Sequence, residues 1–441
     1  MLSQLDTDFV RRDPEIPGLE IILDSEALVS CLASYLPEFN FGNASSHYIR
    51  YKPKTNCLVG YKIEVNGEEI DIHAKALRFD ERGKFKKLAK YPALAGALGS
   101  GRIFFEDSLT VVNITPNDAK LKGLPYLAQL NSHPEKLQQL FPQQPQLWRG
   151  KLKRLRYKTE RRYVAQWLVK NKPRALLKAY TDKDYQVAYN NATRFQSRDI
   201  LCLPKPITAS QSNNIIGFEW LSGYLLSEVI AQRNLELSLI KNVGVALAEL
   251  HTQYPNKLKS MSREAEAQNL LLLANWLSLV YPPLTKQINF LAQKLVDYLV
   301  SLPTLNYPIH GDFYADQVII TGDRVAIIDL DRAMGGDPAA DLGNFLAHLE
   351  RQVVYGKLSK SQISQIHKAL QSGYQTVSPE LITARIKLYA AIGLFRLTPE
   401  PFRYRKSNWS EIMTMFLDRI EQILQQPSHD EYRDYRSIQY Y

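Results

Sequence analysis

The 441-residue sequence predicts an α+β protein with a β-rich first half and a mainly helical second half. Two β-rich stretches in the first half resemble each other, and apolar residues recur at helical spacing through most of the chain after about residue 220. One short strand-turn-strand segment, at residues 307–331, interrupts the helical half. A small sheet region followed by a helical region is a two-lobed layout. We therefore expect the functional site to lie between the lobes.

The two β-rich stretches are residues 45–77 and 152–180. Each opens with an (I/L)RYK motif, passes through two polar turns separated by a strand-like run, and ends in a strand that carries one lysine, Lys75 or Lys178. Alternating polarity with β-branched and aromatic residues predicts two β-hairpins in each stretch. We interpret the pair as an internal duplication of a small sheet unit. The alternative is a chance similarity between two basic, strand-rich stretches.

The helical half is predicted from apolar periodicity in residues 234–252, 263–300, 360–377 and 380–425. Within 307–331, the segment VIITGDRVAIID predicts two strands around the turn Thr321-Gly322-Asp323. The final PSHDEYRDYRSIQYY lacks an apolar period, and we expect it to be mobile. These changes of pattern divide the chain into an N-terminal unit, a second β-rich lobe with a connecting segment, a helical lobe and a tail, at residues 1–145, 146–221, 222–426 and 427–441.

Composition argues against several classes of protein. The three cysteines, Cys31, Cys57 and Cys202, are widely spaced, which argues against a disulfide framework or a structural zinc site and fits a cytoplasmic protein. The N-terminal MLSQLDTDFVRRDPE has acidic residues where an export signal needs an apolar core. The most apolar run, at 270–284, is too short to span a bilayer and is broken by two prolines. We predict a buried helix there and no membrane partner.

The net charge of +10 is unevenly distributed. Residues 1–205 hold 33 lysines and arginines against 22 acidic residues, while the remainder is close to balanced. The basic residues are scattered and form no recognisable nucleic-acid module. We therefore interpret them as a solvated basic face, and the second interpretation is that they attract a polyphosphate. Binding of an anionic polymer is a further alternative, and we do not expect a nucleic-acid partner.

The segment at 307–350 carries the densest motif of the chain. It contains HGD at 310–312, an amide residue five positions after its aspartate, the predicted hairpin, IDLD at 328–331 and DP…DL at 337–342. This segment resembles the aminoglycoside phosphotransferase and choline kinase group of the protein-kinase-like fold. The resemblance is looser over 150–430 and weak over 1–150. It implies a bilobal protein-kinase-like fold with a small β-rich N-lobe, a mainly helical C-lobe and a duplicated N-lobe-like unit at the N-terminus.

Phosphoryl transfer from a nucleotide needs a carboxylate near the attacking hydroxyl, oxygen ligands for Mg²⁺ and a cation on the phosphates. Asp312 lies in a loop before a strand, where it is our candidate catalytic carboxylate. Asp329 follows a strand, where it is held rigidly enough to bind Mg²⁺ together with Gln317. His310 is expected to brace the loop, and Asp331 to be a second-shell or additional metal ligand. A separate expectation is that Asp341 is the N-cap of a helix.

Lys178 is our candidate for the lysine that steadies the α- and β-phosphates. It lies between apolar residues in a strand that precedes the segment IIGFEWLSG, in the order that the resemblance requires. Lys75 has the same place in the first copy, but no catalytic lobe follows that copy directly. By resemblance, the segment after the strand pair contacts adenine, mainly through backbone groups of Phe218, Glu219, Trp220 and Leu221.

Three departures from the family pattern matter. Gln317 stands where the pattern usually has asparagine, and its extra methylene displaces the amide oxygen or forces another rotamer. The turn at 158–161 contains no glycine, so Lys158 or Arg161 would have to hold the phosphates through side chains. No acidic residue lies at the distance where a kinase helix offers its lysine a glutamate, and Gln186 is a weak substitute.

These residues lead to two functional hypotheses. The first is a cytoplasmic, ATP- and Mg²⁺-dependent kinase that acts on a hydroxyl of a small metabolite, with a sugar or polyol favoured over a cationic aminoglycoside because the helical half is nearly neutral. The second is a nucleotide-binding pseudokinase with a regulatory or scaffolding role, which the three departures favour. Retention of both Asp312 and Asp329 favours the enzyme. The sequence leaves the oligomeric state and the role of the N-terminal unit open.

Overall fold

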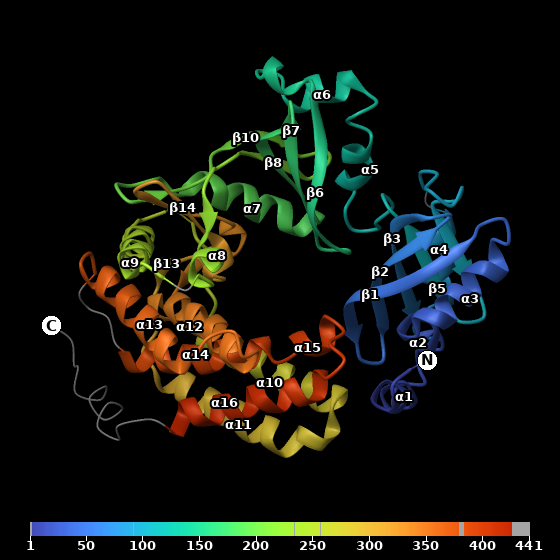
Figure 1. Ribbon diagram of the computed structural model, residues 1–441. Helices are drawn as coiled ribbons and strands as arrows, with labels where there is room; N and C mark the ends of the chain where they lie inside the picture. Colours follow the sequence, from blue (N-terminus) through green and yellow to red (C-terminus); the bar gives the residue numbers. More distant parts are fainter. Residues whose placement is uncertain (1, 91, 233, 256, 379–382, 426–441) are drawn as a thin grey trace.

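The computed structural model describes residues 2–90, 92–232, 234–255, 257–378 and 383–425 (Figure 1). The predicted α+β class is confirmed, with two antiparallel five-stranded sheets in the first half of the chain and a helical lobe in the second. The predicted mobile tail at 427–441 lies outside the described residues.

The first unit is built from three helices followed by an antiparallel sheet. Its strands follow the order β1-β2-β3-β5-β4, with a helix between β3 and β4 in the chain. The three strands that come first form the two predicted hairpins. The elements are α1 (Gln4–Arg11), α2 (Leu19–Leu23), α3 (Ser25–Tyr35), β1 (Phe41–Lys52), β2 (Asn56–Val65), β3 (Glu68–Leu77), α4 (Arg82–Lys90), β4 (Arg102–Phe105) and β5 (Thr110–Ile114).

The second unit has the same strand order. Its sheet is β6-β7-β8-β11-β10, and a helix again follows the third strand. The matching order accords with the predicted duplication, which as a statement about descent stays a prediction. The elements are α5 (Gly123–Ala128), α6 (Pro134–Leu140), η1 (Pro145–Leu147), β6 (Gly150–Lys158), β7 (Arg162–Val169), β8 (Lys172–Tyr180), α7 (Asp182–Arg194), β10 (Pro206–Ser210) and β11 (Ile215–Glu219).

The turn between the two leading strands is the same length in both units. It has three residues, and the middle one, Lys54 or Glu160, has a positive φ of 52° or 53°. In each unit a buried aspartate that precedes the sheet accepts a hydrogen bond from the N–H of this residue and another from the tyrosine hydroxyl of the RYK motif. This aspartate is Asp13 in the first unit and Asp118 in the second. A side chain therefore fixes each turn from outside the sheet.

The helical lobe contains the predicted hairpin, which β14 and β15 form with a two-residue turn at Gly322-Asp323. Its elements are β9 (Leu201–Cys202), β12 (Tyr224–Leu225), α8 (Leu226–Ile230), α9 (Leu237–His251), α10 (Arg263–Val280), η2 (Pro282–Leu284), α11 (Thr285–Ser301), β13 (Tyr307–Ile309), η3 (Ala315–Gln317), β14 (Val318–Thr321), β15 (Arg324–Ile327), η4 (Leu330–Arg332), β16 (Met334–Gly336), α12 (Pro338–Val354), α13 (Lys360–Gln375), α14 (Thr383–Leu397), α15 (Glu400–Arg403) and α16 (Trp409–Gln425).

The helix predicted as buried at 270–284 is half-exposed in the structure. It corresponds to α10 and the turn after it, and Leu272 and Leu279 expose 56% and 51% of their surface. The prediction was wrong because an apolar run was taken as apolar on all sides, whereas one face of the helix packs and the other does not. Among the described residues, no helix combines the length and the apolar character needed to cross a membrane.

The two sheets belong to different hydrophobic cores. The first unit shares one continuous core with the helical lobe, in which Phe9 of α1 packs edge-on against Phe402 of α15, with ring centroids 5.2 Å apart. The second sheet has its own core, which it forms with residues 121–147. The predicted boundary at 145/146 separates these residues from the sheet on which they pack. The division of the chain into domains stays a prediction.

Candidate active site

A cavity of about 1930 Å³ lies between the second sheet and the helical lobe, and the first unit lines its far side. All eight candidate residues line this one cavity, although they come from four separate parts of the chain. The fold therefore brings together the side chains that the motif singled out: Lys178, Phe218, Glu219, Trp220, Leu221, Asp312, Gln317 and Asp329.

Asp312 lies in the loop between β13 and η3, and its side chain is 36% exposed. The preceding His310 is fully buried and braces this loop, because its Nε2 lies 2.8 Å from the carbonyl of Ile328 and its Nδ1 accepts a hydrogen bond from the Asp312 N–H. These contacts agree with the structural role expected for this histidine. Arg332 lies 3.5 Å from the Asp312 carboxylate and forms an ion pair with it.

Asp341 is not the N-cap that we predicted. The cap of α12 is Asp337, which accepts a hydrogen bond from the Ala339 N–H and precedes a proline at the first helical position. Asp341 lies inside the first turn, buried, and accepts hydrogen bonds from the N–H groups of His310 and Gly311. This carboxylate therefore holds the backbone of the loop that carries Asp312. Pro338 was the signal that could have identified the cap, because proline favours that position.

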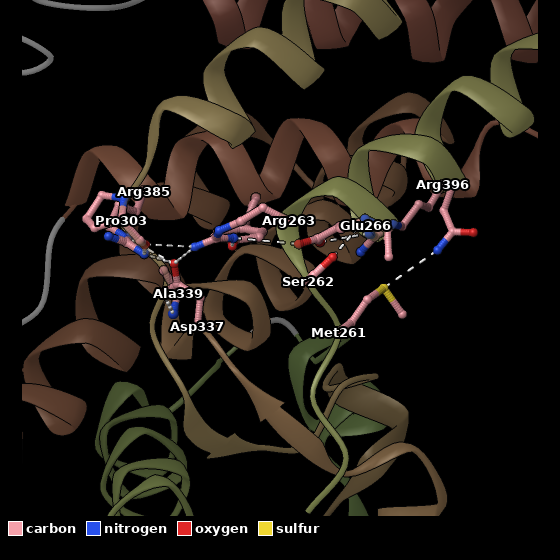
Figure 2. Close-up of polar contacts among 12 residues, drawn as sticks. Met261, Ser262, Arg263, Glu266, Pro303, Asp337, Ala339, Arg385 and Arg396 are labelled. Carbon is pink, nitrogen blue, oxygen red and sulfur yellow. Dashed lines mark hydrogen bonds and ion pairs between the residues drawn. The ribbon is translucent and has the colours of Figure 1, made fainter.

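A buried ionic cluster fixes the start of α12 (Figure 2). Asp337 accepts hydrogen bonds from Arg263 of α10 at 3.1 Å and from Arg385 of α14 at 2.9 Å. All three side chains are buried, and Arg263 also pairs with Glu266 at 3.6 Å. Because Asp337 is anchored by two helices, Asp341 one turn later is placed firmly against the loop that carries Asp312.

Asp329 follows β15 and has a left-handed backbone conformation, with φ at 66°. Its carboxylate accepts a hydrogen bond from Lys178 at 2.9 Å and two from Arg162, at 2.9 and 3.0 Å. Burial alone would raise the pKa of Asp329, but Lys178 and Arg162 outweigh it and hold this pKa well below its ordinary value. The side chain is therefore an anion, as a ligand for a hard cation must be.

Arg162 is a site residue that the sequence did not reveal. It begins β7, directly after the glycine-free turn, and bridges Asp329 and Asp331. Its guanidinium lies over the ring of Tyr180, 5.4 Å from the ring centroid, and Tyr180 donates a hydrogen bond to Asp331. Burial and the neighbouring Asp329 carboxylate raise the pKa of Asp331 to about 6. Nothing in the local pattern separates Arg162 from the other basic residues of this strand pair.

Lys178 lies in the middle of the second sheet, opposite Val164 on one side and Ile216 on the other. Lys75 holds the same position in the first sheet, opposite Leu58 and Val111. Only Lys178 faces Asp329, and its ammonium nitrogen also lies 5.4 Å from the ring centroid of Phe218. The choice of Lys178 over Lys75 therefore rests on a geometric difference between the two units.

Gln317 and Asp329 would be the protein ligands of Mg²⁺. Gln317 is buried at the end of η3, and its backbone carbonyl accepts a hydrogen bond from the Ile328 N–H, which holds the two ligand segments together. Within the described ranges, no group of three or more His, Cys, Asp or Glu side chains is arranged to hold a metal. Two protein ligands fit Mg²⁺ nevertheless, because this ion is commonly bound by one or two carboxylates together with phosphates and waters.

The residues proposed to contact adenine connect the two lobes. Phe218 and Glu219 end β11, and Trp220 and Leu221 follow in the connection to β12. The Glu219 N–H already donates a hydrogen bond to the carbonyl of Lys205, so this amide is not available to a base. The Glu219 side chain accepts a hydrogen bond from the Lys205 N–H, which closes a small ring of contacts at the connection.

Comparison with known protein families gives a match that covers the second sheet and the helical lobe as far as the end of α13. A sequence model described as "Phosphotransferase enzyme family" matches residues 150–378, just over half of the chain. The chain belongs to this family. The predicted family and its protein-kinase-like fold, a β-rich N-lobe joined to a helical C-lobe, are therefore confirmed. No curated protein matches the chain.

Solved structures similar to this phosphotransferase include a kinase family protein and an antibiotic phosphotransferase. A choline/ethanolamine kinase family protein from Mesorhizobium loti is 15% identical, with a TM-score of 0.46, and the match covers 70% of this chain and 97% of the other. A thermostable mutant of aminoglycoside phosphotransferase APH(4)-Ia, in a ternary complex with AMP-PNP and hygromycin B, is 14% identical, with a TM-score of 0.47. That match covers 63% of this chain and 94% of the other.

The predicted weak substitute for the helix glutamate, Gln186, does not contact Lys178 in the phosphotransferase. Its amide donates a hydrogen bond to Asn190 on the exposed side of α7. The helix is held instead by buried Asn191, which donates hydrogen bonds to the carbonyls of Leu330, the first residue of η4, and Ala333, the residue after it. Lys178 has its carboxylate partner in Asp329, so the missing glutamate leaves no unpaired lysine.

Proposed function

We propose that this chain is an ATP- and Mg²⁺-dependent phosphotransferase that acts on a hydroxyl of a small metabolite, with a sugar or polyol as the favoured class. The observation that supports it most is that Asp312, Asp329 and Lys178 line one cavity, with Asp329 ionised and paired to Lys178. These are the parts that phosphoryl transfer requires, because the reaction depends on positioning and on stabilising charge.

In this proposal Asp312 accepts the hydrogen bond of the acceptor hydroxyl and directs its oxygen toward the γ-phosphorus. The loop that carries Asp312 is fixed by Asp341 and His310, so the carboxylate is placed before the substrate arrives. Lys178 would turn from Asp329 to the α- and β-phosphates. When bound, Mg²⁺ would neutralise charge on the β- and γ-phosphates, and Gln317 and Asp329 would hold it there.

The charge of the cavity disfavours a cationic acceptor. Lys158, Arg161 and Arg332 lie at the Asp312 end of the cavity, and Arg332 is within 3.5 Å of the catalytic candidate. A cationic aminoglycoside or choline would approach these like charges at a cost, whereas a neutral polyol would not. We therefore keep the sugar or polyol class ahead of the aminoglycoside class.

A nucleotide-binding pseudokinase remains the second candidate function. The glycine-free turn at 158–161 supports it, because Glu160 occupies a left-handed conformation that glycine would adopt at less cost. Such a protein would bind nucleotide in the same cavity without transferring its phosphate, and would act through the conformation of its lobes.

Phosphate transfer from radiolabelled ATP to a panel of sugars, polyols and amino alcohols, with and without Mg²⁺, tests the proposal. We expect transfer that requires Mg²⁺ and falls by about 10²- to 10⁴-fold in kcat in Asp312→Asn, because this change removes the acceptor for the hydroxyl proton and keeps the size of the side chain. Equal activity of Asp312→Asn would contradict the assignment. Thermal stabilisation by nucleotide without transfer to any compound would favour the pseudokinase.

A further inference from the structure

The turn of the second sheet unit makes a buried ionic contact with the first unit, in addition to the ion pair between Arg154 of β6 and Asp71 of β3. Glu160 lies in the middle of that turn, with a side chain that is 4% exposed, and pairs with two cations of the first unit. Lys75 of β3 donates a hydrogen bond to Glu160 Oε1 at 2.7 Å, and Arg50 of β1 donates one to Oε2. Both carboxylate oxygens of Glu160 are thus bound by the first unit.

The same residue is fixed through its backbone. The Glu160 N–H donates a hydrogen bond of 2.7 Å to Asp118, which also accepts one from the hydroxyl of Tyr157. Asp118 itself is held by the N–H groups of Lys120 and Leu121 through its other oxygen. Glu160 is therefore held at its main chain by the linker between the units and at its side chain by the first unit.

Glu160 is ionised in this environment. Burial would raise the pKa of its carboxyl group, but Lys75, with Arg50, outweighs that effect and lowers the pKa to about 2. A buried carboxylate with two hydrogen-bonded cations is costly to separate from them, because each charge would be left without a partner in a poorly solvated place. Separating this contact therefore costs more free energy than separating an exposed surface ion pair.

The first unit itself is anchored to the helical lobe. Arg405, just after α15, donates two hydrogen bonds of 2.9 Å to Asp6 of α1, and Trp276 of α10 donates one of 3.1 Å to the carbonyl of Tyr51. Arg12 donates one of 2.9 Å to the carbonyl of Val280 at the end of α10. Lys75 and Arg50 thus extend from a platform that is fixed to the lobe carrying Asp312.

We propose that the N-terminal unit positions the phosphate-binding turn of the active site, with Lys75 and Arg50 as positioning residues that act through Glu160. The inference rests on the proposed function, since it assumes that the turn at 158–161 covers a bound triphosphate. A glycine-rich turn approaches phosphates because its backbone is unhindered. This turn has no glycine, and the ion pairs of Glu160 with the N-terminal unit fix its geometry instead. Lys158 and Arg161, on either side of Glu160, are then available to the phosphates.

The test compares the affinity for MgATP with the affinity for adenosine, measured by calorimetry in the full-length chain. In Lys75→Met we expect the affinity for MgATP and kcat/KM for ATP to fall by about tenfold to a hundredfold, because the turn moves away from the phosphates. Adenosine lacks phosphates, so its affinity should be unchanged. Lys75→Arg should restore most of the loss, and Glu160→Gln should reproduce it.

Lys62→Met is the matched control. Lys62 pairs with Glu69 at 2.5 Å in the same sheet, but both side chains are well exposed and neither lies in the cavity. This variant should bind MgATP as the wild type does. Arg50→Gln removes one of the two partners of Glu160 and should give a smaller loss than Lys75→Met, so it serves as the second variant if Lys75→Met does not fold.

Two results would overturn the inference while leaving the proposed function intact. One is wild-type turnover with unchanged MgATP affinity in Lys75→Met and Glu160→Gln. The other is a parallel loss of MgATP and adenosine affinity, which would indicate a general structural effect. A wild-type protein that binds neither MgATP nor adenosine would instead overturn the proposed function, and the inference with it.

Discussion

The two sheet units of this chain share a scaffold and differ in what their central lysines face. Both have the same strand order, a three-residue turn with a left-handed middle residue, and an aspartate that fixes that turn. Lys178 faces Asp329 of the helical lobe, whereas Lys75 faces Glu160 of the other unit.

The comparison teaches that the position of a lysine in a sheet does not decide its role. Lys75 and Lys178 occupy equivalent places in the strand order, yet the chemistry available to each depends on the segment that lies opposite. The first unit shares its core with the helical lobe, and its lysine, Lys75, is directed toward Glu160 in the turn of the second unit. The second unit has a separate core and its lysine is directed toward the end of β15.

In the comparison of the two units, the largest expected effect comes from replacing each central lysine by methionine in a separate variant. Lys178→Met should lower kcat by about 10²- to 10³-fold, because it removes a donor aimed at the charge that develops on the phosphates. Lys75→Met should lower kcat/KM for ATP less, because it acts only through the turn. Steady-state kinetics of both variants measure the difference, and equal losses in kcat would contradict the division of roles.

The two turn-fixing aspartates should differ in stability. Asp118 accepts hydrogen bonds from four donors and Asp13 from two. We expect Asp118→Ala to lower the free energy of unfolding by about 2–3 kcal/mol and Asp13→Ala by about 1–2 kcal/mol, because each change leaves buried donors without acceptors. Urea denaturation measures both. Only Asp118→Ala should also weaken MgATP binding, and a matching loss in Asp13→Ala would show that the turns are not independent.

The smallest expected effect is a pH dependence specific to the second unit. Burial, followed by the nearby Arg156 and Arg161, lowers the pKa of Lys158 to about 8. Lys158 is charged below that pH and neutral above it, so kcat/KM for ATP should fall by roughly threefold to tenfold between pH 7 and pH 9. Lys158→Arg should remove the decline. The counterpart in the first unit, Lys52, should leave the profile unchanged when replaced by glutamine.

The local part of the fold and the site could be predicted from the sequence. The hairpin at 318–327 and the helices of the second half follow from apolar patterns that depend on neighbours in the chain. Asp312, Gln317 and Asp329 belong to one short segment, and the structure places all three in one cavity. The roles proposed for them remain predictions.

The remaining features depend on contacts between distant segments. Glu160 meets Lys75 across 85 positions of the chain, and Arg162 meets Asp329 across 167, so no local pattern indicates either pair. Asp341 was assigned by its place before an apolar run, although its partners come from the loop that carries Asp312, 30 and 31 positions earlier, and from His251, 90 positions earlier. Sequence reasoning identified residues of the right type and missed the segments against which they fold.

The anchoring of the first unit has a consequence for how the cleft opens. Residues 219–224 connect the second sheet to the helical lobe covalently. The ion pairs of Glu160 connect them a second time, through the first unit, which is anchored to the helical lobe. Figure 1 draws the first unit away from the covalent connection. The two halves can then separate only when the ion pairs of Glu160 break. For the proposed kinase we therefore expect release of the nucleotide product to be slower than phosphate transfer.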